Sequence, residues 1–205
     1  MDSKIGAEER IMQAAIAVFC LRGYDGARMQ EIADSADISK ASLHYYFRSK
    51  ENLFRKTVRE LFSSIIRNIR SRISEDDSIE EVIGKLVNGY VDMFTAHRRQ
   101  AFYFLTELMK HEEVLSEIMA GLDTSAFTGG ILERFRKERE AGTIIDIEPV
   151  DLLINIIGMS VFPIMAEPML KRALNLSEAE FSNLLAKRKP IVINFVLAAV
   201  LRDKP

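Results

Sequence analysis

The sequence has 205 residues, 48% of them hydrophobic and 28% charged, with a formal net charge of −2. This length and composition predict a soluble globular chain with a sizeable core, in one domain or two. A single cysteine, Cys20, excludes a disulfide framework and a multi-cysteine zinc site. Apolar residues recur at helical spacing without sustained alternation, so we expect an all-α fold.

Targeting and membrane signals are weak. The first ten residues, MDSKIGAEER, contain no apolar signal-peptide core. The longest apolar stretches, residues 152–165 and 191–201, are shorter than the roughly 20 residues that cross a bilayer. We therefore expect a cytoplasmic protein that does not use a membrane.

Charge differs between the two ends of the chain. Residues 1–72 contain 13 Lys and Arg against 9 Asp and Glu, whereas residues 73–205 contain 15 against 21. A modestly basic front and an acidic rear favour a front that meets a polyanion.

Helix signals in the front part are closely spaced. An amphipathic helix is predicted over residues 8–22, with Gly23 as its stop, followed by a short helix over residues 29–36. The chain turns at Asp37 and Ile38, and Ser39 is a good N-cap for a helix that ends near Phe47. Ser49 is a second N-cap and begins a long helix that reaches at least residue 69.

The rear part begins after a polar segment, residues 74–78, which is the best candidate for a boundary. Ser78 and Ser177 each begin a capping-box pattern, and Pro149 suits the first turn of a helix. Helices are predicted over residues 78–95, 98–110, 112–122, 125–140, 149–166 and 177–201. Pro190 should kink or break the last of them.

Short helices separated by a tight turn suggest a helix-turn-helix. The second helix of such a pair enters the DNA major groove with its N-terminal residues. Lys40, Ala41 and Ser42 occupy the first turn of the predicted helix, where they can reach base edges. Leu43 and Phe47 are four residues apart and should anchor that helix to the core.

The remaining surface of this helix carries donors for phosphate oxygens. His44, Tyr45 and Tyr46 lie around it, and Lys50 begins the next helix, where the helix dipole also favours an anion. Adjacent aromatic residues are, however, commonly core or interface residues, and cations on short helices commonly form a solvated face. Composition alone does not decide between DNA contacts and these plainer interpretations.

The segment ISKASLHYYFRSKENLF, residues 38–54, resembles the signature of the TetR/AcrR family of bacterial one-component transcription regulators. The resemblance extends upstream through AAIAVFCLRGYDGARMQEIADSADIS and covers residues 11–54. It implies a homodimer of nine or ten helices per chain. A three-helix DNA-binding domain, residues 1–52, would bind a palindromic operator, and residues 53–205 would bind an inducer and dimerise.

The resemblance also implies roles for single residues. The positions that approach bases are Gln30, Lys40, Ala41, Ser42 and Tyr45, and those that hold the DNA backbone are Arg28, His44, Tyr46 and Lys50. Three residues depart from the family pattern. Arg28 replaces a Thr or Ser, Ala41 replaces a common Gly, and His44 replaces a Tyr, so the contact of His44 is in doubt.

The rear part is rich in methionine and phenylalanine, which suit an adaptable cavity for a small apolar or amphipathic ligand. The candidate ligand residues are Phe94, Phe102, Met109, Met119, Phe127, Met159 and Phe162. The plainer alternative is that these side chains form the core of a helical bundle.

The last two long helices are too apolar for an exposed surface. Packing against a second copy of the chain as a four-helix bundle would cover them. The candidate dimer contacts are Ile154, Ile157, Val161, Ile193, Val196 and Val200.

No catalytic pattern emerges. There is no P-loop, no dinucleotide-binding glycine pattern and no HExxH, and the three histidines are widely spaced. We expect no cofactor and no metal site, and we do not expect an enzyme. The sequence predicts a ligand-responsive, dimeric DNA-binding regulator, a repressor released from its operator by a small, mostly apolar inducer. Two alternatives stay open: a helical small-molecule binder whose front domain has lost DNA affinity, and an all-α enzyme.

Overall fold

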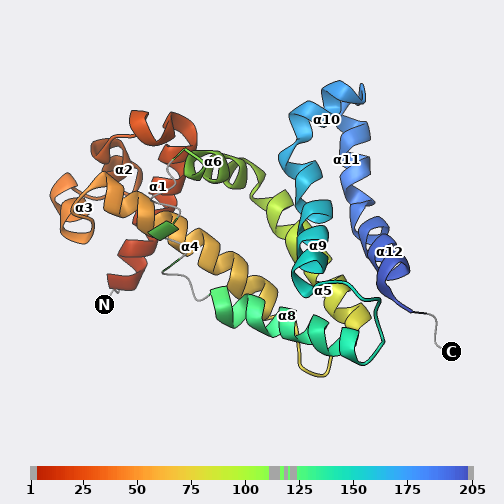
Figure 1. The fold of residues 1–205 in the computed structure, drawn as a ribbon. Helices are drawn as coiled ribbons and strands as arrows, with labels where there is room; N and C mark the ends of the chain where they lie inside the picture. Colours follow the sequence, from red (N-terminus) through yellow and green to blue (C-terminus); the bar gives the residue numbers. More distant parts are fainter. Residues whose placement is uncertain (1–3, 111–115, 118–119, 121–123, 203–205) are drawn as a thin grey trace. The chain divides into compact units, whose positions relative to one another are not determined.

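The fold is described by a computed structural model, which covers residues 4–110, 116–117, 120 and 124–202. This part of the chain forms eleven helices and no strand, and one antiparallel bridge pairs Ile144 with Leu201 (Figure 1). The all-α prediction is confirmed.

The chain packs as two compact units that do not follow chain order. The front unit comprises Met1–Ser64 and Arg99–Leu122, and the rear unit comprises Ile65–Arg98 and Asp123–Pro205. The expected division into residues 1–52 and 53–205 separates functions rather than packing units, and it stays a prediction.

The front unit contains α1 (Lys4–Gly26), α2 (Met29–Ser35), α3 (Lys40–Tyr46), the first part of α4 (Lys50–Arg70) and most of α6 (Arg98–Leu108). Its core includes Phe19, Ile32, Leu43 and Phe54, and the rings of Phe19 and Phe54 meet edge-on with centroids 5.2 Å apart. Gly23 interrupts α1 with a φ of 74°, which glycine adopts without steric cost. The predicted stop is therefore present, and one further turn follows it.

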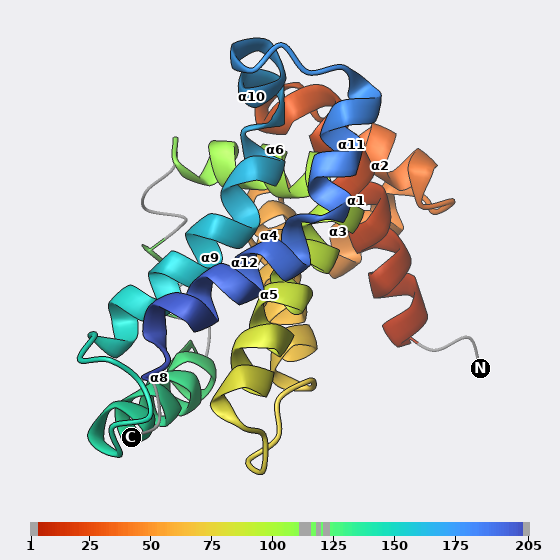
Figure 2. The same cartoon turned by 90° about the vertical axis from the view of Figure 1, so that its right-hand side faces the viewer.

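The rear unit contains the end of α4 and six further helices. These are α5 (Ile79–Ala96), α8 (Thr124–Glu140), α9 (Pro149–Met165), α10 (Glu167–Ala173), α11 (Glu178–Ala186) and α12 (Arg188–Val200). Helices α5, α9 and α12 pack against one another, and α8 packs against α9 (Figure 2). Ser78 and Ser177 form the predicted capping boxes, and Pro149 begins α9.

In the rear unit one helix was not predicted, and one predicted break is present. Helix α10 was not predicted, and Pro168 lies in its first turn, where proline is tolerated. The predicted break in the segment over residues 177–201 is present: the segment forms two helices, which divide at Lys187, with Pro190 in the first turn of the second. The predicted helix over residues 112–122 lies largely outside the described residues.

A proline in α9 frees a backbone carbonyl that bonds to α12. Pro163, inside α9, has no N–H to donate to the Met159 carbonyl four residues earlier. Arg188, the first residue of α12, donates to that carbonyl from Nε at 3.1 Å and from Nη2 at 2.9 Å. The arginine thus satisfies an acceptor that the helix itself leaves unpaired.

Among the described residues, no single helix has both the length and the apolar character to cross a membrane. Helices α9 and α10 meet those criteria only as a pair bent by 75°.

Candidate nucleic-acid interface

The turn between α2 and α3 is tight and internally bonded. Asp37 adopts a φ of 54°, a left-handed conformation that aspartate tolerates better than most residues. The Ile38 N–H donates to the Ala33 carbonyl at 3.0 Å. The Ser39 hydroxyl then accepts from the Ser42 N–H at 3.0 Å, which is the predicted N-cap of α3. These bonds fix where α3 begins and in which direction it runs.

One side of α3 holds it to the front core. Leu43 is fully buried and Phe47, its C-cap, is nearly so, and both belong to the same core cluster as α1 and α2. The predicted anchoring role of these two residues is confirmed. Lys40, Ala41 and His44 lie outside this contact and are exposed. The helix is therefore held to the core by its apolar side, and these three residues are left open to solvent.

The two tyrosines of α3 differ in burial. Tyr45 is 74% exposed, whereas Tyr46 is half-buried and packs against the front core. Their rings meet edge-on, with centroids 5.6 Å apart and an interplanar angle of 84°. Such edge-to-face pairs restrict both rings, so Tyr46 limits the positions that Tyr45 can take at the surface.

Ser42 and Gln30 are engaged within their own helices or caps. The Ser42 hydroxyl oxygen lies 2.9 Å from that of Ser39, and the Gln30 side-chain amide donates to Asp34 at 2.7 Å. Arg28 is exposed and lies at the N-cap position of α2 without a side-chain capping bond. Its charge lies beside the positive end of the helix dipole, which also favours an anion.

His44, whose role the sequence left in doubt, contacts the connection to α4. Its Nδ1 lies 3.3 Å from the Arg48 carbonyl oxygen. A carbonyl oxygen only accepts, so this contact requires a proton on Nδ1. The neutral ring then has an acceptor at Nε2 and donates to a phosphate from that atom only when it is protonated.

Lys50 makes contacts that the family signature did not indicate. Its ammonium donates to the carbonyls of Tyr24 at 2.9 Å, Asp25 at 3.2 Å and Ala27 at 3.3 Å, and it lies 4.6 Å from the centre of the Tyr24 ring. An ammonium has three N–H donors, and all three have acceptors here. In this conformation Lys50 joins α4 to the end of α1 and has no N–H left for phosphate.

These features define a class of protein. A capped short helix follows a tight turn, is locked to a helical core by one side and exposes a polar face on the other, which is the form of a helix-turn-helix DNA-binding domain.

Comparison with known proteins agrees. The family model described as "Bacterial regulatory proteins, tetR family" matches residues 11–57. The "Probable HTH-type transcriptional regulator YttP" of Bacillus subtilis is 27% identical over 146 residues, which span 69% of this chain and 70% of that protein. The negative transcriptional regulator IcaR of Staphylococcus epidermidis is 34% identical over 73 residues, which span 36% of this chain and 40% of IcaR.

The fold agrees as well. The crystal structure of the transcriptional regulator FadR from Bacillus subtilis in complex with stearoyl-CoA superposes with a TM-score of 0.67 and 17% identity, over 90% of this chain and 97% of FadR. Residues 11–57 are thus similar to the DNA-binding part of tetR-family regulators, and the chain as a whole has the fold of such a regulator.

The residues expected to bind a ligand are divided between the two units. Phe94 and Met159 are half-buried against the rear core, and Phe162 is 53% exposed on α9. Phe102 on α6 and Met109 just after this helix are exposed, and both belong to the front unit. Met119 and the side chain of Phe127 lie outside the described residues. Their assignment as ligand residues stays a prediction.

The expected dimer residues divide by burial. Ile154 is 59% exposed, whereas Ile157, Val161 and Ile193 are half-buried. Val196 and Val200 are 2% and 3% exposed in the chain's own core, so they fill that core instead of facing a partner. The reason is the angular position on α12: residues 192, 196 and 200 form its inner face.

The structure shows exposed apolar residues that the sequence reasoning missed. These are Val150 on α9 and Ile191 and Phe195 on α12, each more than half exposed. Val150, Ile154 and Phe162 are spaced by multiples of four along α9, and Ile191 and Phe195 by four along α12, so each set lies on one helix face. This spacing is visible in the sequence. However, a helix that is apolar on two faces shows the same spacing on both, so the sequence does not tell which face is exposed.

Proposed function

We propose that this protein is a homodimeric repressor that binds a palindromic operator and releases it when a small, mostly apolar ligand binds the helical rear part. The observation that carries the DNA-binding half is the exposed polar face of α3, fixed by the Ser39 cap and by buried Leu43. In this proposal Lys40, Ala41 and Tyr45 approach bases, and Arg28 holds phosphate.

The homodimer is supported by the exposed apolar faces of α9 and α12, the outer-face set, defined as Val150, Ile154, Phe162, Ile191 and Phe195. These two helices pack against each other, so a second copy using the same faces would complete a four-helix bundle. A two-fold dimer presents two α3 helices, which matches a palindromic site.

A ligand-induced change in operator affinity requires that the ligand bind one conformation more tightly than the other. FadR, the fold neighbour described above, binds stearoyl-CoA. This makes an apolar or amphipathic ligand a reasonable first class to test here. We place the protein in the cytoplasm as a binding protein rather than an enzyme.

The test is a gel-shift titration on DNA flanking the gene of this protein, with salt varied. A sequence-specific shift is expected, with log affinity falling linearly as log salt rises because counterions are released from phosphates. The absence of any specific shift at low salt without ligand would instead favour a small-molecule binder without DNA affinity.

Two variants separate base contacts from phosphate contacts. Lys40→Ala should change base preference, with a loss of about tenfold or more at one base pair. Arg28→Ala should weaken binding to all sequences alike and reduce the salt slope by about 0.9. A change of base preference in Arg28→Ala, with none in Lys40→Ala, would reverse this assignment.

A further inference from the structure

A groove in the rear unit lies between the turn that follows α4 and one face of α8. Its volume is about 690 Å³, within the range of small-molecule sites. Ile73, Val82 and Ile131 supply apolar lining. None of the described phenylalanine and methionine side chains expected to bind a ligand lines it.

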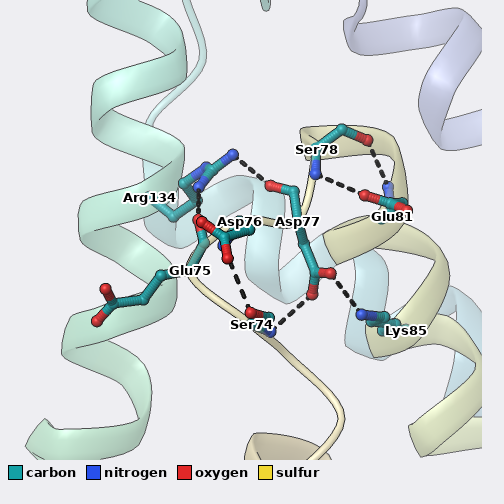
Figure 3. A network of polar contacts seen from close by, with 8 residues as sticks. All are labelled: Ser74, Glu75, Asp76, Asp77, Ser78, Glu81, Lys85 and Arg134. Carbon is teal, nitrogen blue, oxygen red and sulfur yellow. Dashed lines mark hydrogen bonds and ion pairs between the residues drawn. The ribbon is translucent and has the colours of Figure 1, made fainter.

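One wall of the groove is held rigid by Arg134 of α8. Its Nε donates to Glu138 at 2.9 Å. Its Nη1 donates to the Glu75 carbonyl at 3.0 Å, and its Nη2 donates to the Asp77 carbonyl (Figure 3). The Asp77 carboxylate in turn accepts from the Ser74 N–H at 2.7 Å and from Lys85 at 2.5 Å. Arg134 therefore shapes the groove and is not available to a ligand head group.

Two other cations of the groove are uncommitted. Arg70 at the end of α4 and Lys137 of α8 are exposed, and neither side chain makes a hydrogen bond or ion pair within the described part of the chain. Of the two carboxylates in the lining, Glu133 is paired with Arg136. The Glu75 carboxylate extends away from the Arg134 network (Figure 3).

We propose that this groove binds an amphipathic anion. The oxyanion head would be held by Arg70 and Lys137, and the apolar chain would lie over Ile73, Val82 and Ile131. A guanidinium matches the geometry of a carboxylate or phosphate, and a preformed wall lowers the cost of ordering the site. The inference rests on the proposed function for its biological meaning, since it names the class of ligand and where that ligand binds.

Two neighbouring glycines of α8 allow a matched test of whether the ligand binds in this groove. A Cβ at Gly129 or Gly130 would meet no heavy atom within 4 Å, but only Gly130 lines the groove. Both substitutions improve helix propensity, so both proteins should fold. By isothermal titration with decanoate below its micelle concentration, Gly130→Phe should weaken binding at least about tenfold. Gly129→Phe should bind as the unmodified protein does.

Charge variants test the class of ligand. Arg70→Gln and Lys137→Gln should each weaken decanoate binding by about tenfold, as expected for loss of a charge-assisted hydrogen bond. Lys187→Gln, an exposed cation on the same unit, is the control and should have no effect. Glu75→Gln removes a nearby negative charge and should tighten binding.

The probes separate the possible heads. Decanoate and decyl phosphate should both bind, and their ratio tells which oxyanion is preferred. Decanol and decyltrimethylammonium should bind at least about tenfold more weakly, because neither offers an acceptor with negative charge. Circular dichroism and melting temperature verify that each variant is folded.

Equal binding of decanoate and decanol, or decanoate binding unchanged by Gly130→Phe, would overturn the proposal. These titrations contain no DNA, so they are independent of the gel shifts. A protein that binds decanoate in the groove but shifts no operator would retain this site and refute the proposed repressor. The opposite result would refute the site alone.

Discussion

Helices α3 and α12 are built on the same plan and expose opposite chemistry. Each is anchored by apolar side chains four residues apart: Leu43 and Phe47 for α3, and Val192 and Val196 for α12. The outer face of α3 carries Lys40 and Tyr45, whereas that of α12 carries Ile191 and Phe195. Both helices are therefore anchored by buried apolar side chains. The residues on the exposed face decide whether the helix suits contact with a polyanion or with another apolar surface.

A second contrast concerns cations bound to carbonyl groups. Lys50 in the front unit donates to three carbonyls near the end of α1, and Arg188 in the rear unit donates twice to the Met159 carbonyl. One residue belongs to a DNA-binding signature and the other to no motif, yet both hold helices together. A cationic residue at a position predicted to contact phosphate is therefore not by itself evidence of that contact.

The largest effect is expected from the outer-face set. The double variant Ile154→Glu with Phe195→Glu would place two charges in an apolar contact between copies, and it should weaken dimerisation by about a hundredfold or more. Analytical ultracentrifugation measures this directly. Leu21→Glu, at an exposed apolar position of the front unit, is the control and should remain dimeric. A double variant that stays dimeric at low concentration would show that the copies meet elsewhere.

A smaller effect is expected from Lys50→Met. Loss of three hydrogen bonds to carbonyls should lower the free energy of unfolding by about 1–3 kcal/mol and weaken operator binding through misplacement of α3. Since the ammonium has no N–H left for phosphate, the salt slope of DNA binding should not change. A slope reduced by about 0.9, with unfolding unaffected, would restore the phosphate role implied by the family signature.

Arg188 and Pro163 provide a coupled prediction. Arg188→Met leaves the Met159 carbonyl without a donor and should destabilise the protein by about 1–3 kcal/mol. In a Pro163→Ala background a backbone N–H becomes available, so the same change should cost clearly less. Urea unfolding of the four proteins gives the coupling energy. Additive effects would mean that Arg188 acts through some other contact.

The smallest effect is a pH dependence at Asp77. Hydrogen bonds from Lys85 and from the Ser74 N–H, with the nearby positive charges, hold the pKa of this carboxyl below its ordinary value of 3.8. A lowered pKa in the folded state adds stability above pH 3.8, which is lost as pH falls through the folded value. Asp77→Asn should therefore be less stable than the unmodified protein at pH 7, and the gap should narrow at acid pH.

The gap is measured by urea unfolding at several pH values, with Asp76→Asn as the control because Asp76 is exposed in the same turn. A gap that stayed constant with pH would mean that Asp77 acts only through its shape and hydrogen bonding.

Local signals determined much of the fold. The N-caps at Ser39 and Ser49, the capping boxes at Ser78 and Ser177, and the stop at Gly23 are all present as predicted. Each depends on a side chain and a backbone group within a few residues, so the sequence holds all the information needed. The same is true of the helix-turn-helix, because Leu43 and Phe47 identify the inner face of α3.

Only the tertiary structure decided how long-range partners are used. Val196 faces the core and Phe195 faces outward, although both are apolar neighbours on α12. The use of Lys50, Arg134 and Arg188 depends on carbonyls 23 or more residues away. Helical periodicity places residues on a common face, but it does not say which face another element covers. That choice depends on which elements pack together. The packing of α12 against α5 and α9 buries Val196 and leaves Phe195 exposed, and the three cations find their carbonyl partners on other segments of their own unit.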